Sequence, residues 1–157
     1  MKRFFTMVAV CILIFTTASL VLAQSDPRVG TWKLNTAKSK SDAPPRKSET
    51  RTYQSSGDSI MMHAEVMNND GSKQVYGYTG KLDGKDYPYT GQQPGGAETL
   101  SVKRVGNIFN PESKKGGKVL FTTKSTFSND GKVMTLTTKG TDAKGQSANS
   151  VRVYDKQ

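Results

Sequence analysis

The sequence predicts an all-β protein, an up-and-down antiparallel meander of about 8–10 strands that closes into a barrel. Three observations predict this fold. Pairs of residues typical of tight turns recur every 10 to 14 residues. The segments between them alternate apolar and polar residues. No useful stretch after the N-terminal apolar run has the 3.6-residue period of an amphipathic helix.

The first element is an N-terminal signal peptide. Lys2 and Arg3 precede a long apolar run that ends at the small residue Ala23. Hydroxyl residues interrupt this run and no basic cluster follows it, which argues against a membrane anchor. We therefore expect residues 1–23 to be removed and residues 24–157 to form one secreted or periplasmic domain that does not span the membrane.

Removing the signal peptide changes the composition that matters for function. The only cysteine, Cys11, lies within the signal, so the mature chain would have neither a disulfide nor thiol chemistry. The signal carries two basic residues and no acidic ones, which lowers the net charge from +10 to +8. The remaining domain is poor in apolar residues, so a shell around a partly polar interior is a better expectation than a filled sandwich. We expect a monomer.

The strands follow in order along the chain. The first is "VGTWKLN" at residues 29–35, which holds the only tryptophan. The polar segment 36–47 contains Pro44 and Pro45, so we expect a long, mobile loop near the mouth of the barrel. Tyr87-Pro88-Tyr89 is expected to be a short edge strand, because proline cannot donate to a ladder. The other predicted strands are "SETRTYQ", "SIMMHAEVM", "KQVYGYTGKL", "TLSVKRV", "KVLFTTKSTF", "KVMTLTTKG" and "NSVRVYD".

Turns are expected at eight places between these strands, where glycine tolerates the positive φ of a tight hairpin. Short hairpins force consecutive strands to be antiparallel neighbours, and closing the sheet removes its exposed edges. The eight signals are Gly57-Asp58, Asp70-Gly71, Asp83-Gly84, Gly95-Gly96, Gly106-Asn107, Gly116-Gly117, Asp130-Gly131 and Lys144-Gly145.

An outer-membrane barrel is a poor fit to these strands, because its lipid-facing side must be apolar. In "KVLFTTKSTF" both faces carry hydroxyl residues, and one of them also carries Lys124. Neither face could meet lipid tails, so we expect a barrel in water.

The two ends of the domain resemble those of the calycin superfamily, the lipocalins and fatty-acid-binding proteins. The motifs are Gly30-Thr31-Trp32 near the start and Arg152-Val153-Tyr154 at the end. The resemblance implies a lipocalin-like barrel in which Trp32 plugs the base and a basic side chain from a late strand lies across it. Calycins of the fatty-acid-binding branch have two helices between their first strands, where this chain has the Pro44-Pro45 segment. The stretch "DGKDYPYTG" also resembles a family of small secreted bacterial proteins, which implies no particular activity.

Arg152 and Tyr154 share one face of the last strand, which leaves two interpretations. In the first, the guanidinium and the phenol converge as an anion clamp inside the cavity, as the resemblance to the fatty-acid-binding branch implies. In the second, which we favour, Arg152 stacks on Trp32 and Tyr154 fills the base, so that Gly30, Trp32 and Arg152 together close the barrel.

Further side chains on the strand patterns could line a pocket for an apolar ligand. Each of them could equally be ordinary core. The candidates are Met62, Tyr76, Tyr78, Phe121 and Phe127.

Nothing in the sequence favours an enzyme. His63 is the only histidine, and the alternation around it places His63 and Glu65 outside the barrel. No nucleophile elbow, glycosidase pair or metal-binding spacing is present, so we expect no catalytic residues, no metal and no cofactor.

Two functions therefore remain. The first is binding of a small apolar or amphipathic ligand in the cavity of a secreted or periplasmic barrel. The second is a non-enzymatic surface interaction, in which the basic exterior contacts a polyanion. No motif with interleaved aromatics predicts specific binding of nucleic acid.

Overall fold

The computed structural model describes residues 26–157, so the predicted signal peptide at residues 1–23 lies outside the described residues. Within 26–157 there are ten strands and no helix, and hence no helix that could cross a membrane. The strands are β1 (Gly30–Ser41), β2 (Arg46–Ser56), β3 (Ser59–Asn68), β4 (Lys73–Gly80), β5 (Tyr87–Gly91), β6 (Thr99–Val105), β7 (Ile108–Lys115), β8 (Lys118–Phe127), β9 (Val133–Gly140) and β10 (Ser150–Lys156).

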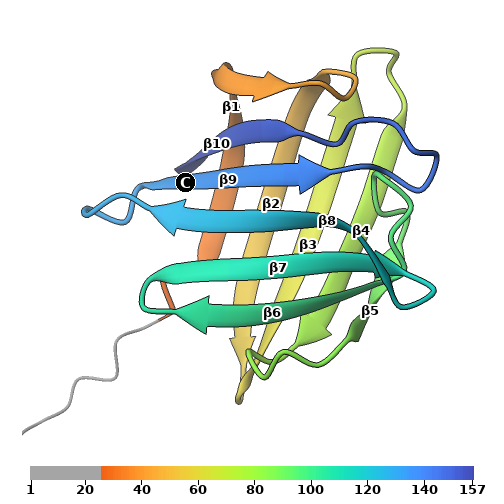
Figure 1. Ribbon diagram of the computed structural model, residues 1–157. Coiled ribbons are helices and arrows are strands. Elements are labelled where there is room, and N and C mark those ends of the chain that lie inside the picture. Colours follow the sequence, from red (N-terminus) through yellow and green to blue (C-terminus); the bar gives the residue numbers. More distant parts are fainter. Residues whose placement is uncertain (1–25) are drawn as a thin grey trace, which may run out of the picture.

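The strands form a closed antiparallel meander, which confirms the predicted fold class. Each strand pairs with its neighbour in the chain, and β1 pairs with β10 to close the sheet (Figure 1). Each of the eight predicted turns falls between two consecutive strands. Ten strands have nine connections, and the one without a predicted turn pair is the proline-containing connection between β1 and β2.

The prediction of a long loop over residues 36–47 is wrong, because β1 continues to Ser41 and only residues 42–45 connect it to β2. The register against β10 shifts between Asn35 and Lys40, and pairing resumes where Lys40 meets Val151. At this bulge the Ser39 hydroxyl accepts a hydrogen bond from the Val153 amide at 3.0 Å. Polar residues thus continue the strand because β10 supplies the ladder and a side chain bridges the irregular step.

Two proline-containing strands differ from expectation. β5 pairs with both β4 and β6, so the segment with Pro88 is not an edge strand. β7 was not predicted, since Pro111 interrupts its pattern, yet it pairs with β6 along its whole length. Toward β8 no pair is formed at Pro111 itself, which matches its missing N–H. A closed barrel tolerates these prolines because the flanking residues complete the ladder.

The end of the barrel at which β1 begins is filled with aromatic residues. Trp32 and Phe109 are almost fully buried, and Phe127 packs edge-on against both at centroid distances of 5.7 and 5.8 Å. The Trp32 Nε1 donates to the backbone carbonyl of Arg28 at 2.7 Å, and the Arg28 guanidinium lies over the Phe109 ring. Trp32 thus lies in the base of the barrel, where the first and last strands pair.

The basic side chain across Trp32 is Lys156 and not Arg152, which corrects the favoured interpretation. The Lys156 Nζ lies 5.1 Å from the centre of the indole ring. Gly30 makes room for this side chain, because a Cβ at Gly30 would lie 2.8 Å from the Lys156 Cε. The glycine of the Gly-x-Trp motif thus serves barrel closure, together with Trp32 and the last lysine of β10.

Candidate functional site

A cavity of about 790 Å³ occupies the other half of the barrel, above the aromatic plug. Its mouth is formed by the connections β1–β2, β3–β4, β5–β6 and β9–β10. Five of the seven residues predicted to bind a ligand line it, namely Met62, Tyr76, Tyr78, Phe121 and Arg152.

The other two predicted residues do not line the cavity. Phe127 belongs to the aromatic plug beside Trp32. Tyr154 is fully buried, and its ring lies 5.3 Å from the Arg51 Cζ. Its hydroxyl has no hydrogen-bond partner among the described residues. Alternation places Tyr154 on the inner face with Arg152, but the register against β1 and β9 packs it below the cavity, opposite Leu34 and Met134.

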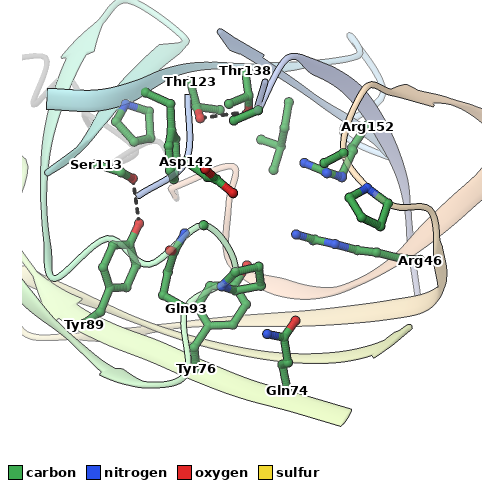
Figure 2. A pocket seen from close by; sticks show the side chains of 18 of the residues that line it. Arg46, Gln74, Tyr76, Tyr89, Gln93, Ser113, Thr123, Thr138, Asp142 and Arg152 are labelled. Carbon is green, nitrogen blue, oxygen red and sulfur yellow. Dashed lines mark hydrogen bonds between the residues drawn. The ribbon is translucent and has the colours of Figure 1, made fainter. Parts of the chain in front are cut away.

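One wall of the cavity is made of tyrosines. The Tyr89 ring meets Tyr76 and Tyr78 edge-on, each at a centroid distance of 6.2 Å. The Tyr89 hydroxyl lies 3.0 Å from the Ser113 Oγ (Figure 2). Burial raises the pKa of all three tyrosines, so they stay neutral at any physiological pH. The wall offers aromatic faces with a few hydroxyls, which suits a largely apolar ligand.

A buried ion cluster on β2 adjoins the tyrosine wall. Glu49 is fully buried on β2, and its two carboxylate oxygens accept from Arg46 and from Arg51, the latter at 2.5 Å. Arg51 also donates to the Tyr76 hydroxyl at 2.7 Å. Burial alone would raise the pKa of Glu49, but Arg51 and then Arg46 lower it to about 2. Glu49 is therefore a permanent carboxylate that fixes two guanidinium groups.

Arg152 is the arginine of the cavity lining that has no carboxylate partner among the described residues. It donates to the hydroxyls of Ser150 at 2.8 Å and Ser41 at 3.2 Å. Burial lowers its pKa, and the charge of Arg46 adds to this effect. Figure 2 shows Arg46 and Arg152 pointing into the cavity from one side, while Tyr89 and Ser113 lie on the other side. Three arginines and one carboxylate leave this wall with an excess of two positive charges.

The acidic residues that line the cavity itself come from the loops of the mouth, and they are held by other partners. Asp42 accepts from the Ser147 hydroxyl, and Asp142 accepts from the amides of Lys144 and Gln146. Asp70 likewise accepts from the Ser72 amide and hydroxyl. None of these carboxylates lies within ion-pair distance of an arginine of the described chain. The excess charge of the arginine wall is therefore not neutralised locally.

The mouth is partly closed by the β9–β10 connection. Its Ala143 amide donates to the Gly95 carbonyl at 2.8 Å, which ties it to the β5–β6 connection across the opening. On the other side the Asp42 amide donates to the Asn149 carbonyl at 2.9 Å. These two bonds, together with the hydrogen bond from the Ser147 hydroxyl to Asp42, hold residues 141–149 over the cavity.

The sequence reasoning missed Arg46, Glu49 and Arg51. The alternation of "SETRTYQ" does place Glu49, Arg51 and Tyr53 on one face, but charged residues on one strand face normally indicate solvent. The prediction that His63 and Glu65 lie outside the barrel is confirmed. Both residues are exposed, and the His63 Nε2 lies 3.4 Å from the Glu65 Oε1. Residues 26–157 hold no cluster of potential metal ligands.

Comparisons with known proteins agree with the fold. No family model and no curated protein sequence matches the chain. The structure is similar to that of the REP1-NXSQ fatty acid transporter, with a TM-score of 0.58, 14% identity, and coverage of 82% of this chain and 95% of that one. It is also similar to a point mutant of the fluorescent protein UnaG, with a TM-score of 0.59, 19% identity, and coverage of 85% and 99%.

A third similar structure is the zebrafish ileal bile acid-binding protein in complex with cholic acid. Its TM-score is 0.55 at 13% identity, with 83% of this chain and 99% of that chain covered. At such identities the likeness shows the fold alone, a closed antiparallel barrel of ten strands. The resemblance to a secreted bacterial family stays a prediction.

Proposed function

We propose that this protein binds a small amphipathic molecule with an anionic head inside its barrel, and that it acts as a carrier outside the cytoplasm and not as an enzyme. The observation that carries the proposal is a cavity of about 790 Å³ with tyrosines on one side and, on the other, three arginines against a single buried carboxylate. Cavities of this size accommodate drug-sized ligands. Such a lining favours a molecule with an apolar body and a negative end.

Two further observations support this proposal. Arg152 has spare donors, since it is bonded only to serine hydroxyls among the described residues, and a guanidinium binds an oxyanion with two parallel hydrogen bonds. Two of the similar structures are named for a fatty acid and a bile acid, both amphipathic anions. Cleavage after Ala23 would deliver the barrel to the cell envelope or the medium, and intact mass of the exported protein tests this.

Calorimetric titration with decanoate tests the binding function. We expect binding to the wild type and a loss of about tenfold in Arg152→Met, because the head group loses a charge-assisted partner in a site shielded from water. Arg104→Met is the matched control, since Arg104 lies over the Phe109 ring at the closed end. Native mass spectrometry of the purified protein should show a co-purified amphipathic anion. Absence of binding by decanoate and decanol alike would contradict the proposal.

A further inference from the structure

A second, smaller pocket lies beside the main cavity and shares residues with it. This side pocket has a volume of about 240 Å³ and is lined by Arg46 and Arg152, which also line the main cavity. Its other walls come from the second half of β1 and from Pro44 and Pro45 of the β1–β2 connection. The two arginines therefore stand between two spaces, with room for ligand atoms on both sides.

The side pocket exists because β1 departs from its regular pairing with β10. The register shifts between Asn35 and Lys40, and Thr36, Ser39 and Lys40 line the pocket at this place. A regular ladder would have brought β1 directly against β10. The bulge, with the Ser39 hydroxyl bridging to Val153, thus opens a space directly behind the guanidinium of Arg152.

The chemistry of this pocket is that of an oxyanion site. Three cationic side chains line it, namely Lys40, Arg46 and Arg152, together with hydroxyls of β1. Within residues 26–157, the only carboxylate bonded to any of these three is Glu49, which Arg46 shares with Arg51. A head group with a single negative charge would leave positive charge of the arginines unbalanced, and a doubly charged head would not.

We propose that the ligand's head group is a doubly charged oxyanion, of the phosphate monoester type, seated between Arg46 and Arg152 with its outer oxygens in the side pocket toward Lys40. This inference rests on the proposed function, because it places the tail of the same molecule in the main cavity. A planar carboxylate can engage one guanidinium in parallel fashion. A tetrahedral phosphate presents three oxygens, and so reaches both arginines and the lysine at once.

The second ionisation of a phosphate monoester gives the inference a pH signature. Its pKa is about 6, so the head carries one charge below pH 6 and two above it. An alkyl sulfate has the same tetrahedral shape but a single charge at every pH. If the site selects two charges, affinity for an alkyl phosphate rises with pH while affinity for the sulfate does not. The arginines stay charged over this range.

The experiment compares decyl phosphate, decyl sulfate, decanol and inorganic phosphate by calorimetry between pH 5 and pH 8, at low micromolar concentration. We expect decyl phosphate to bind about tenfold more tightly at pH 8 than at pH 5, and decyl sulfate to change less than about twofold. Lys40→Met should lower the affinity for decyl phosphate at pH 8 by about threefold or more and leave the affinity for decyl sulfate nearly unchanged. Lys38→Met is the matched control, because Lys38 is exposed on the same strand and does not line either pocket.

The outcomes separate this inference from the proposed function. Equal, pH-independent binding of the phosphate and the sulfate would overturn the inference and leave ligand binding in the cavity intact. If decanol, decyl sulfate and decyl phosphate all fail to bind, both the inference and the proposed function are wrong. Inorganic phosphate binding as tightly as decyl phosphate, with the same sensitivity to Lys40→Met, would support the oxyanion site and identify its ligand as free phosphate. Arg46→Met should also weaken the binding of decyl phosphate. This substitution removes a partner of the buried Glu49 and could prevent folding. If the Arg46→Met protein does not fold, the result for Lys40→Met decides whether the inference holds.

Discussion

Trp32 is the residue around which the barrel closes, and its environment is a ring of aromatic and cationic contacts. It is fully buried, donates its N–H to the Arg28 carbonyl, and has Lys156 across one face. Trp32→Ala should lower the free energy of unfolding by about 3–5 kcal/mol, because it empties the base of the barrel. Lys156→Met should cost about 0.5–1 kcal/mol, since the lysine is exposed and the cation–π contact is partly solvated.

Double-mutant cycles in urea unfolding check the identity of the partner. Coupling is expected between Trp32 and Lys156 and not between Trp32 and Arg152. A measurable coupling to Arg152 with none to Lys156 would contradict the arrangement described here.

Tyr154 offers a second prediction at this scale. Its hydroxyl is buried without a hydrogen-bond partner in the described residues, and burying an unsatisfied polar group costs about 1–3 kcal/mol. Tyr154→Phe should therefore raise the free energy of unfolding by about 1 kcal/mol. Tyr89→Phe is the control and should lower it by about the same amount, because it removes the contact with the Ser113 hydroxyl. Denaturant titration of both variants measures this, and a destabilised Tyr154→Phe would show that the hydroxyl is satisfied.

At the scale of the element, the β9–β10 connection over residues 141–149 acts as a strap across the mouth. It is held by the Ala143 bond to Gly95 and by two bonds to Asp42, one through the backbone and one through the Ser147 hydroxyl. A connection fastened only at its edges opens more easily than the strands below it. We therefore expect the strap to open before the strands below it.

Asp42→Ala tests the strap. Loss of the Asp42–Ser147 hydrogen bond should speed amide hydrogen exchange across residues 143–148 by several-fold and raise the ligand dissociation rate. Asp130→Ala removes a similar bond to Ser128 in the β8–β9 turn at the closed end, and it should leave exchange at the mouth unchanged. The same exchange experiment should find Lys40 and Ser41 protected, because they pair with β10 and do not belong to a mobile loop. Unchanged exchange in Asp42→Ala would mean that the strap is held by other contacts.

At the scale of the whole molecule, the buried Glu49 couples stability to pH. Its pKa lies at about 2 in the fold against an ordinary value of 4.5, so the folded state favours the charged carboxylate. The stabilisation is fully present above about pH 5 and is lost as the pH falls from about 4.5 toward 2. Its size is about 3 kcal/mol, in the range found when one member of a buried ion pair is removed.

Glu49→Gln checks this coupling. The variant should be less stable than the wild type by about 3 kcal/mol at pH 7, and the gap should shrink as the pH approaches 2. Glu65→Gln is the control, because Glu65 is exposed and its ion-pair contact among the described residues is with His63 alone. Denaturant unfolding at a series of pH values gives both curves. A constant gap between Glu49→Gln and the wild type would rule out proton linkage at this site.

If residues 1–23 are removed as predicted, the remaining chain has a net charge of +8, and this charge carries the second prediction at this scale. At +8 the exterior should retain the protein on heparin at low salt, and retention should fall steeply as salt rises, because the contacts depend on released counterions. Cleavage of the signal must be confirmed by mass first, so that the charge is known. No retention at low salt, or retention that ignores salt, would remove the polyanion interaction.

Much of the fold could be read from local chemistry. The glycine-containing turn pairs set every hairpin from β2 to β10, because positive φ is required at fixed places in tight turns. The alternation of apolar residues put Met62, Tyr76 and Tyr78 on the inner face, and Gly30 with Trp32 marked the closing strand. These features depend on neighbours in the chain, so a sequence pattern is sufficient to find them.

The site depended on contacts between strands that the pattern does not relate. Whether Lys156 or Arg152 lies over Trp32 is decided by the register of β10 against β1, and residues an even number apart on one face are indistinguishable by alternation. The bulge before Lys40 and the burial of Glu49 arise only when β1, β2 and β10 meet. Glu49 would be solvated on an isolated strand, and it is buried because the closed barrel covers this face of β2, where Arg46 and Arg51 of the same strand neutralise it. The sequence by itself determined the shell and its closure, and the tertiary structure decided which charges face the cavity.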